Sequence, residues 1–233
     1  MSLFFRCSYA FQIYCSIGIY LCLLVVLYVP QSTAIFSSSS FVDTDYIFDE
    51  GEVHFYPCKT VNCRALLTTV LAQSTEANCA FYDLEDEVII HALTTHQNAT
   101  VLLFDEENEA LLSANHLFLP VSSLALMHHK FCIFNDQYVF TGSVNPTQRG
   151  FFSHDNYALL IESKLVARAY MQEFQRLRQD SFVGAPATHV NLSGVLIDVC
   201  FSPKQQCEQY VVNVITRAQH FVSVLSFSFT SAS

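Results

Sequence analysis

Short apolar runs of strand length alternate along this chain with segments whose apolar residues recur at helical spacing. Val53–Phe55 and Cys79–Tyr82 predict strands, and Cys63–Ala72 between them predicts a helix. The alternation continues through a helix at Glu85–Thr95, strands at Val101–Phe104, Lys130–Phe134 and Tyr138–Thr141, and a helix at Leu165–Arg178. This order predicts an α/β fold with a largely buried mixed β-sheet and helices on both of its faces.

Size and charge limit the functions open to such a fold. The chain has 233 residues, of which 52% are hydrophobic, so it can bury a sizeable core in one or two domains. Its formal net charge is -10, whereas proteins that bind nucleic acid usually carry a basic patch. Nucleic acid is therefore the less favoured partner, and any phosphate chemistry must be local.

The N-terminus has the pattern of a targeting segment. Residues 10–29 form an apolar stretch long enough to cross a bilayer, and Ser32 and Ala34 beyond it fit a small-x-small cleavage site. Residues 1–34 are therefore expected to be a signal peptide or an uncleaved membrane anchor that associates with the membrane through residues 10–29. In both cases the remaining chain is expected outside the cytosol, either secreted or anchored facing outward.

The cysteines agree with an oxidising compartment. Cys58 with Cys63, and Cys200 with Cys207, are close enough in sequence to close short disulfide loops. Cys132 lies inside an apolar run and is predicted to be a buried free thiol. Zinc is the alternative for the two local pairs, but neither spacing is common in zinc sites.

A weak internal repeat suggests that the chain begins one structural unit twice. Residues 55–57 (FYP) precede Cys63 and an apolar helix, and residues 201–203 (FSP) precede Cys207 and a similar helix. Each copy then continues into a β-rich run.

The repeat and the composition divide the chain after its leader into four parts. We expect a linker at 35–52, one complete module at 53–180, a second linker at 181–198 and the truncated start of a second module at 199–233.

Four polar side chains interrupt the two apolar runs near the middle of the chain. His128 and Lys130 are two apart, so in a strand they point to the same face. A hairpin from Phe131 to Thr141 would fold Ser143 and Asn145 back towards them. An imidazole, an ammonium, a hydroxyl and an amide around one point suit a phosphate site, although a His-x-Lys pair is also common at solvated strand ends.

This spacing resembles the HKD signature of the phospholipase D superfamily, HxKxxxxD followed by GSxN. The segment 150–161 (GFFSHDNYALLI) also resembles that family, and the similarity extends over residues 53–180 and again over 199–232. The resemblance implies an α/β/α module, preceded here by the N-terminal hydrophobic helix, that cleaves phosphodiesters through a phosphohistidine without metal or cofactor.

Carried onto this sequence, the resemblance assigns a role to each matching residue. His128 would be the nucleophile or the general acid, Lys130 and Asn145 would bind phosphate oxygens, and Ser143 would support the site by hydrogen bonding.

Two departures from the family pattern affect the expected activity. Asn135 stands where the family has Asp, and an amide cannot stabilise an imidazolium as a carboxylate does, so a weakened or inactive site is expected. The chain also has one HKD motif where family sites use two. A homodimer would bring two copies of His128 together, whereas the unfinished repeat suggests a tandem ancestor or a shortened gene product.

Other candidate sites have less support. His128 and His129 with His116 or Cys132 are a poor metal set, because adjacent strand residues point to opposite faces. The chain has six glycines and none in a nucleotide-binding pattern.

The sequence therefore predicts a phospholipase D-like phosphodiester hydrolase, with phospholipid as the favoured substrate. The alternatives are an inactive module that retains the fold for binding or assembly, and an exported nuclease of the same superfamily.

Overall fold

A computed structural model of the protein describes most of the chain beyond residue 45. The described residues are 11–15, 46–121, 127–179, 186–202, 205, 207–218 and 222–226.

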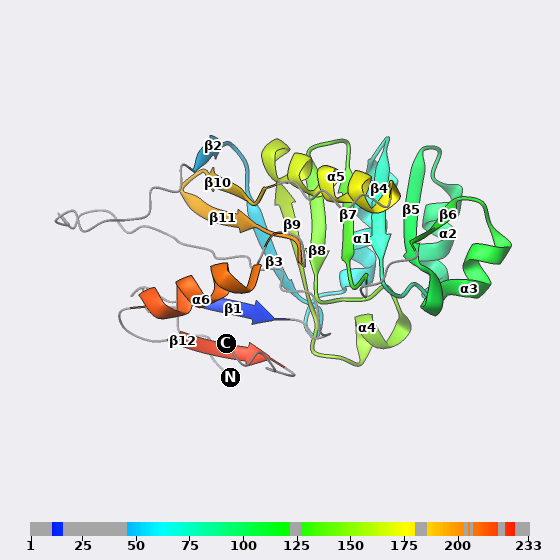
Figure 1. The fold of residues 1–233 in the computed structure, drawn as a ribbon. Coiled ribbons are helices and arrows are strands. Elements are labelled where there is room, and N and C mark those ends of the chain that lie inside the picture. The colour runs from blue at the N-terminus through cyan, green and yellow to red at the C-terminus, as the bar shows by residue number, and fades with distance from the viewer. Residues whose placement is uncertain are drawn as a thin grey trace.

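The main body is built on a seven-stranded sheet (Figure 1). In spatial order its strands are β3 (Val53–Pro57), β9 (Tyr157–Glu162), β8 (Tyr138–Gly142), β7 (Lys130–Phe134), β4 (Ala77–Phe81), β5 (Ala99–Phe104) and β6 (Phe118–Val121). The pairs β4–β5 and β5–β6 are parallel, and the remaining pairs are antiparallel. The predicted mixed sheet is confirmed, and the predicted strand Lys130–Phe134 has the observed bounds.

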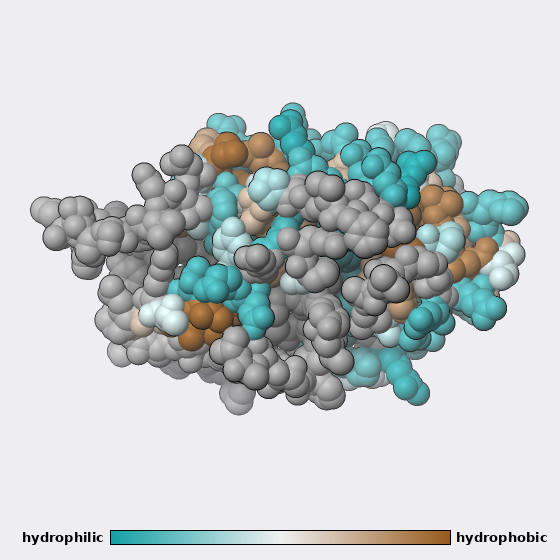
Figure 2. Space-filling view, in the orientation of Figure 1, coloured by the Kyte–Doolittle hydropathy of each residue, from teal (hydrophilic) through white to brown (hydrophobic). Residues whose placement is uncertain are grey.

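Helices cover both faces of this sheet, as the sequence predicted (Figure 1). One buried cluster joins the sheet to α1 (Cys63–Gln73) and α2 (Glu87–Thr95). The cluster on the opposite face joins it to α5 (Lys164–Arg178). Two further helices, α3 (Asp105–Ala114) and α4 (Gln148–Phe152), were not predicted. Most buried apolar side chains are gathered in the two clusters, and in the coloured part of the face drawn in Figure 2 small hydrophobic patches lie among hydrophilic residues.

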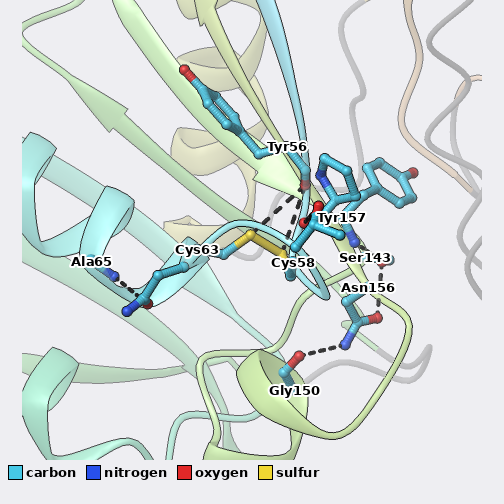
Figure 3. Close-up of a disulfide and its surroundings, with 11 residues drawn as sticks. Tyr56, Cys58, Cys63, Ala65, Ser143, Gly150, Asn156 and Tyr157 are labelled. Carbon is cyan, nitrogen blue, oxygen red and sulfur yellow. Dashed lines mark hydrogen bonds between the residues drawn. A yellow bond between two sulfur atoms is a disulfide. The ribbon is translucent and has the colours of Figure 1, made fainter.

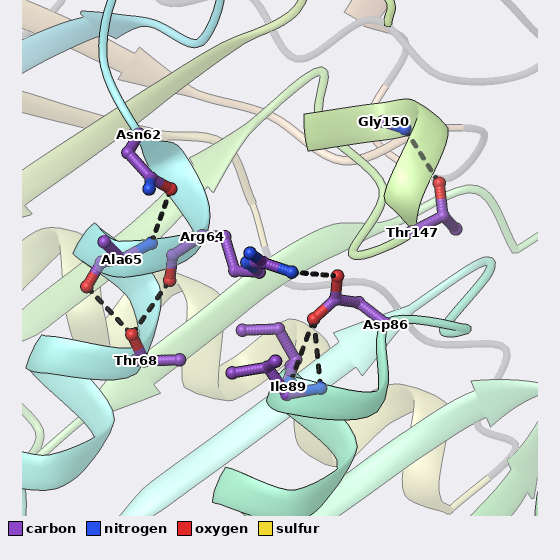
Figure 4. Close-up of polar contacts among 9 residues, drawn as sticks. Asn62, Arg64, Ala65, Thr68, Asp86, Ile89, Thr147 and Gly150 are labelled. Carbon is purple, nitrogen blue, oxygen red and sulfur yellow. Dashed lines mark hydrogen bonds and ion pairs between the residues drawn. The ribbon is translucent and has the colours of Figure 1, made fainter. Parts of the chain in front are cut away.

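Side-chain caps fix where the helices begin. The Asp86 carboxylate accepts hydrogen bonds from the N–H groups of Val88 and Ile89, so α2 begins at Glu87 and not at Glu85 as predicted (Figure 4). Asp86 also pairs with Arg64 of α1 at 3.3 Å. The same carboxylate thus starts one helix and joins it to its neighbour.

A second, three-stranded sheet lies almost entirely within the segments expected to be linkers, since only Val199 falls beyond them. It has the order β11 (Val195–Val199), β10 (Thr188–Leu192), β2 (Ile47–Asp49). The predicted linkers 35–52 and 181–198 therefore contain ordered strands. The alternation of buried and partly buried residues in β10 and β11 shows that this sheet packs one face inward.

The second copy of the repeat has the same order of elements as the first. Helix α6 (Cys207–Arg217) follows a cysteine loop and precedes β12 (Val222–Ser226), as α1 precedes β4. Strand β12 pairs in parallel with β1 (Phe11–Cys15). The expected hydrophobic helix at 10–29 thus coincides in part with a strand, and its other residues lie outside the described ranges. Among the helices that the structure describes, none has the length and apolar character needed to cross a bilayer.

Three disulfides join described cysteines. Two of them, Cys58–Cys63 and Cys200–Cys207, are the predicted short loops. The third joins Cys79 to Cys132. The prediction of a free thiol at Cys132 was wrong, because β4 and β7 are antiparallel neighbours and their register places the two cysteines directly opposite each other.

Candidate active site

Four of the five predicted site residues lie at one edge of the main sheet, where three strands start or end together. Lys130 begins β7 and is paired with Phe81, the last residue of β4. Gly142 ends β8 at the same edge, because Phe131 is paired with Thr141. His128 precedes β7, and Ser143 and Asn145 follow β8. The hairpin therefore brings its two polar ends to one edge, as expected.

Lys130 is a buried ammonium directed at the backbone beside His128. Its side chain is only 6% exposed, and its Nζ donates a hydrogen bond to the His128 carbonyl oxygen at 3.0 Å. Burial lowers the pKa of Lys130 to about 7, while the negative charge of Asp83 acts in the opposite direction. At neutral pH the Lys130 amine is therefore only partly protonated. A bound anion beside it would favour the protonated, charged form.

The His128 imidazole is neutral at physiological pH. Burial lowers its pKa to about 3, and the positive charges of Lys130 and His129 add to this effect. Only two buried side-chain polar atoms lack a hydrogen-bond partner in the described part of the chain, and they are His128 Nδ1 and Asn145 Oδ1. Buried polar groups are almost always satisfied, so two such atoms from the two ends of one hairpin indicate a site built to bind a ligand.

Ser143 holds the hairpin end against the next strand (Figure 3). Its hydroxyl donates to Asn156 Oδ1 at 2.9 Å and accepts from the Tyr157 N–H at 3.1 Å. Asn156 in turn donates to the Gly150 carbonyl oxygen at 2.9 Å. These bonds fix the backbone that leads to Asn145, which is compatible with the supporting role predicted for Ser143.

Only glycine fits at the position before Ser143. Gly142 has a φ of +149°, and a Cβ there would collide with the Tyr157 carbonyl oxygen. This close approach of β8 to β9 explains why the polar segment starts with Gly-Ser.

The segment that contains this site matches a known protein family. Residues 68–178 match the family model described as "Cardiolipin synthase, PLD-like domain". This region belongs to the phospholipase D superfamily.

Two curated relatives are mitochondrial cardiolipin hydrolases from frogs. The protein from Xenopus tropicalis is 25% identical over 145 residues, which cover 54% of this chain and 69% of the relative. The protein from Xenopus laevis is 36% identical over 58 residues, which cover 25% of this chain and 28% of the relative. Among solved structures, the phospholipase D family member Nuc from Salmonella typhimurium aligns with a TM-score of 0.49 and 16% identity, covering 56% of this chain and 95% of Nuc.

Asn135, at the position of the Asp in the phospholipase D signature, does not lie with His128. It occupies the turn between β7 and β8, at the opposite end of the strand and on the order of 20 Å from His128 along the chain. Both Asn135 and Asp136 have positive φ, as a tight hairpin turn requires. The sequence predicted a weakened or inactive site because Asn135 replaces a carboxylate beside the histidine, but the side chain of Asn135 is too far away to reach the His128 imidazole.

His129 points away from the site, as expected for the residue between His128 and Lys130. Its Nε2 lies 3.0 Å from Oε1 of Glu173, which belongs to α5 on the other face of the sheet. Burial opposes the ionisation of Glu173, but hydrogen bonds from Arg176 and His129 outweigh it and lower the carboxyl pKa. This buried group anchors the backbone between the two candidate catalytic residues.

The residues that follow β4 into the site, Tyr82 and Asp83, were not predicted from the sequence. The Tyr82 ring centroid lies 4.7 Å from that of His128, and Asp83 follows it. Burial raises the pKa of Asp83 to about 6, with further contributions from Glu85 and Glu107. The sequence did contain a signal for them. Tyr82 and Asp83 directly follow a fully buried strand, and polar residues at the end of such a strand are candidates for a site at that edge of the sheet. Within the described residues, no group of three or more acidic, His or Cys side chains could hold a metal.

Proposed function

We propose that this protein hydrolyses phosphodiester bonds, with phospholipid as the favoured substrate, through a phosphohistidine at His128. The observation that carries the proposal is the pair of buried unpartnered atoms, His128 Nδ1 and Asn145 Oδ1, beside the buried ammonium of Lys130. A neutral imidazole, a cation and an amide are the groups that this reaction requires.

Each group has a distinct part in the proposed reaction. An imidazole nitrogen of His128 attacks phosphorus while the bond to the leaving oxygen breaks, and a second imidazole protonates that oxygen. Water then attacks the phosphohistidine, giving up a proton to the second imidazole, and His128 is regenerated. Lys130 and the amide of Asn145 would bind the phosphate oxygens. The pKa of His128, about 3, keeps the nucleophile unprotonated at neutral pH.

The second imidazole is proposed to come from another copy of the chain. One module supplies one His128, and an isologous dimer would place two of them around a shared axis. His129 is unsuited to this role because it lies on the other face of the sheet against Glu173.

The charges around the site favour a substrate with few phosphates. Asp83, Glu85 and Glu107 lie near enough to one another to raise the pKa of Asp83, and Glu106 adds to the negative charge felt by Tyr82. A polyanion such as nucleic acid would be repelled by this group, whereas a single phosphodiester held by Lys130 would not. The names of the two frog relatives make cardiolipin one lipid to test.

The proposed compartment is extracytoplasmic, either secreted or anchored. Three disulfides among the described cysteines support it, because such bonds persist mainly in oxidising compartments.

The test is hydrolysis in EDTA by the wild-type chain, His128→Ala and the control His91→Ala, whose imidazole is exposed on α2. The substrates are a chromogenic phosphodiester, vesicles of phosphatidylcholine with and without cardiolipin, and single-stranded DNA. Light scattering gives the oligomeric state, and alkaline quenching followed by phosphorus NMR detects the phosphohistidine, which is stable in base and labile in acid. We expect turnover by a dimer, lost in His128→Ala and retained in His91→Ala. A folded wild-type protein without turnover on any substrate would refute the enzyme and favour the inactive binding module.

A further inference from the structure

Tyr82 contacts both of the groups that the proposed reaction uses. Its ring meets the His128 ring edge to face, with the planes at 62° and the centroids 4.7 Å apart. Lys130 Nζ lies 5.2 Å from the centroid of the same ring. An aromatic face attracts an ammonium, and an edge-to-face contact fixes the relative tilt of two rings.

Four contacts hold Tyr82 in place, two through its backbone and two through its side chain. The Tyr82 N–H donates to the His129 carbonyl oxygen at 2.8 Å, and the Tyr82 carbonyl oxygen accepts from Asn108 Nδ2 at 2.8 Å. The phenol donates to Glu107 Oε1 at 2.8 Å, and the ring stacks on Phe104 with centroids 5.6 Å apart. Tyr82 is therefore fixed by backbone, hydroxyl and ring together.

Within the described residues, the imidazole of His128 has no comparable support from hydrogen bonds. Its Nδ1 is buried and unpartnered in the described part of the chain, so no carboxylate or carbonyl there sets the tilt of the imidazole through that atom. The edge-to-face contact with Tyr82 is the described interaction that does so. The charges that act on this imidazole come from Lys130 and His129, and neither of them fixes its plane.

We propose that Tyr82 is the positioning residue of this site, and that its ring fixes the plane of the His128 imidazole and holds the Lys130 ammonium beside it. Nucleophilic attack depends on the direction of the imidazole lone pair, and an error of about 1 Å or a small tilt costs on the order of 100-fold in rate. The predicted effect of Tyr82 on kcat rests on the proposed function. The predicted effect on the orientation and titration of His128 does not.

The matched variants separate the ring from the hydroxyl. Tyr82→Phe retains the ring and loses the bond to Glu107, whereas Tyr82→Leu and Tyr82→Met fill space without an aromatic face. In the full chain we expect Tyr82→Phe to keep kcat within about threefold, because Phe104 and the backbone still hold the ring. Tyr82→Leu and Tyr82→Met should lower kcat by about 10- to 100-fold with a much smaller change in KM. If Tyr82→Leu does not fold, Tyr82→Met is used in its place.

A titration of His128 by NMR gives a readout that does not need turnover. The His128 resonance, assigned by its loss in His128→Ala, should titrate near the pKa of about 3 in the wild type and in Tyr82→Phe. Without the ring, water reaches the imidazole and its pKa should rise towards the ordinary value of 6.5. An unchanged titration in folded Tyr82→Leu or Tyr82→Met would overturn the proposal, as would an equal loss of kcat in Tyr82→Phe. If the wild type has no activity, the proposed function fails and the titration alone decides the role of Tyr82.

Discussion

The side-chain oxygen of Asn135 accepts two hydrogen bonds from Thr75, one from its backbone N–H at 2.9 Å and one from its hydroxyl at 3.0 Å. The Glu76 N–H donates a third at 3.1 Å. The turn between β7 and β8 is thereby tied to the loop between α1 and β4. All three donors need only an acceptor, which an amide oxygen and a carboxylate oxygen both provide.

Asn135→Asp should therefore leave kcat within about twofold of the wild type, because the three bonds remain and the residue is far from His128. Asn135→Ala should lower the free energy of unfolding by about 1–3 kcal/mol, with unchanged activity per folded molecule. Denaturant unfolding and turnover measure the two effects. Asp136→Ala is the control, since it has the same positive φ and an exposed side chain. A large loss of kcat in Asn135→Asp would contradict this assignment.

The buried ammonium of Lys130 destabilises the folded chain. Its pKa of about 7 in the folded chain is below its ordinary value of 10.5, so folding is penalised while both states are protonated. The penalty is full below pH 7 and disappears as the pH rises from 7 to 10.5, because the unfolded state then binds more protons.

Lys130→Met should accordingly be more stable than the wild type, by about 1–4 kcal/mol at pH 6, and inactive. The difference in unfolding free energy should shrink between pH 7 and pH 10. Urea unfolding at several pH values tests this, with Lys164→Met as the control because Lys164 is exposed. A stability difference that is the same at pH 6 and pH 10 would be inconsistent with a buried, titrating Lys130.

What the sequence could predict depended on how far apart the interacting residues lie. The strand at Lys130–Phe134 and the helix starting at Cys63 were predicted because their patterns are local. The hydrogen bonds of Asn135 and the ring contact of Tyr82 were not predicted. Each joins segments more than 40 residues apart, and the sequence does not show how such segments are aligned in space. β2 has three residues, which is too short for any periodicity to appear.

The same reason explains why the Cys79–Cys132 disulfide was missed, since 53 residues separate the two cysteines. Replacing both by Ala should lower the free energy of unfolding by about 3–4 kcal/mol, because the bond closes a long loop in the unfolded chain. The pair Cys58–Cys63 closes a loop of five, and its double Ala variant should lose about 2 kcal/mol. Mass spectrometry of unreduced peptides checks the pairing, and a free thiol at Cys132 would refute it.

The buried carboxylate of Glu173 supports the segment between His128 and Lys130 from the far face of the sheet. It is 4% exposed and accepts from His129 Nε2 at 3.0 Å and from Arg176 Nε at 2.7 Å. Its pKa is lowered, so its contribution to stability is present above the pKa of the unfolded chain, about 4.5, and is lost as the pH falls through the lower folded value.

Glu173→Gln should therefore lower the free energy of unfolding by about 3–5 kcal/mol at pH 7, because the partly buried Arg176 guanidinium loses its counter-charge. The difference from the wild type should diminish as the pH falls from about 4.5 through the lower folded pKa, where protonation removes the same charge from the folded wild type. Urea unfolding at pH 7 and at pH 3 measures both effects, and Glu109→Gln on the exposed side of α3 is the control. Because His129 links Glu173 to the chain between His128 and Lys130, kcat should fall in Glu173→Gln even under conditions where the variant is fully folded. A destabilised variant with unchanged kcat would show that the far-face anchor stabilises the fold without setting the geometry of the site.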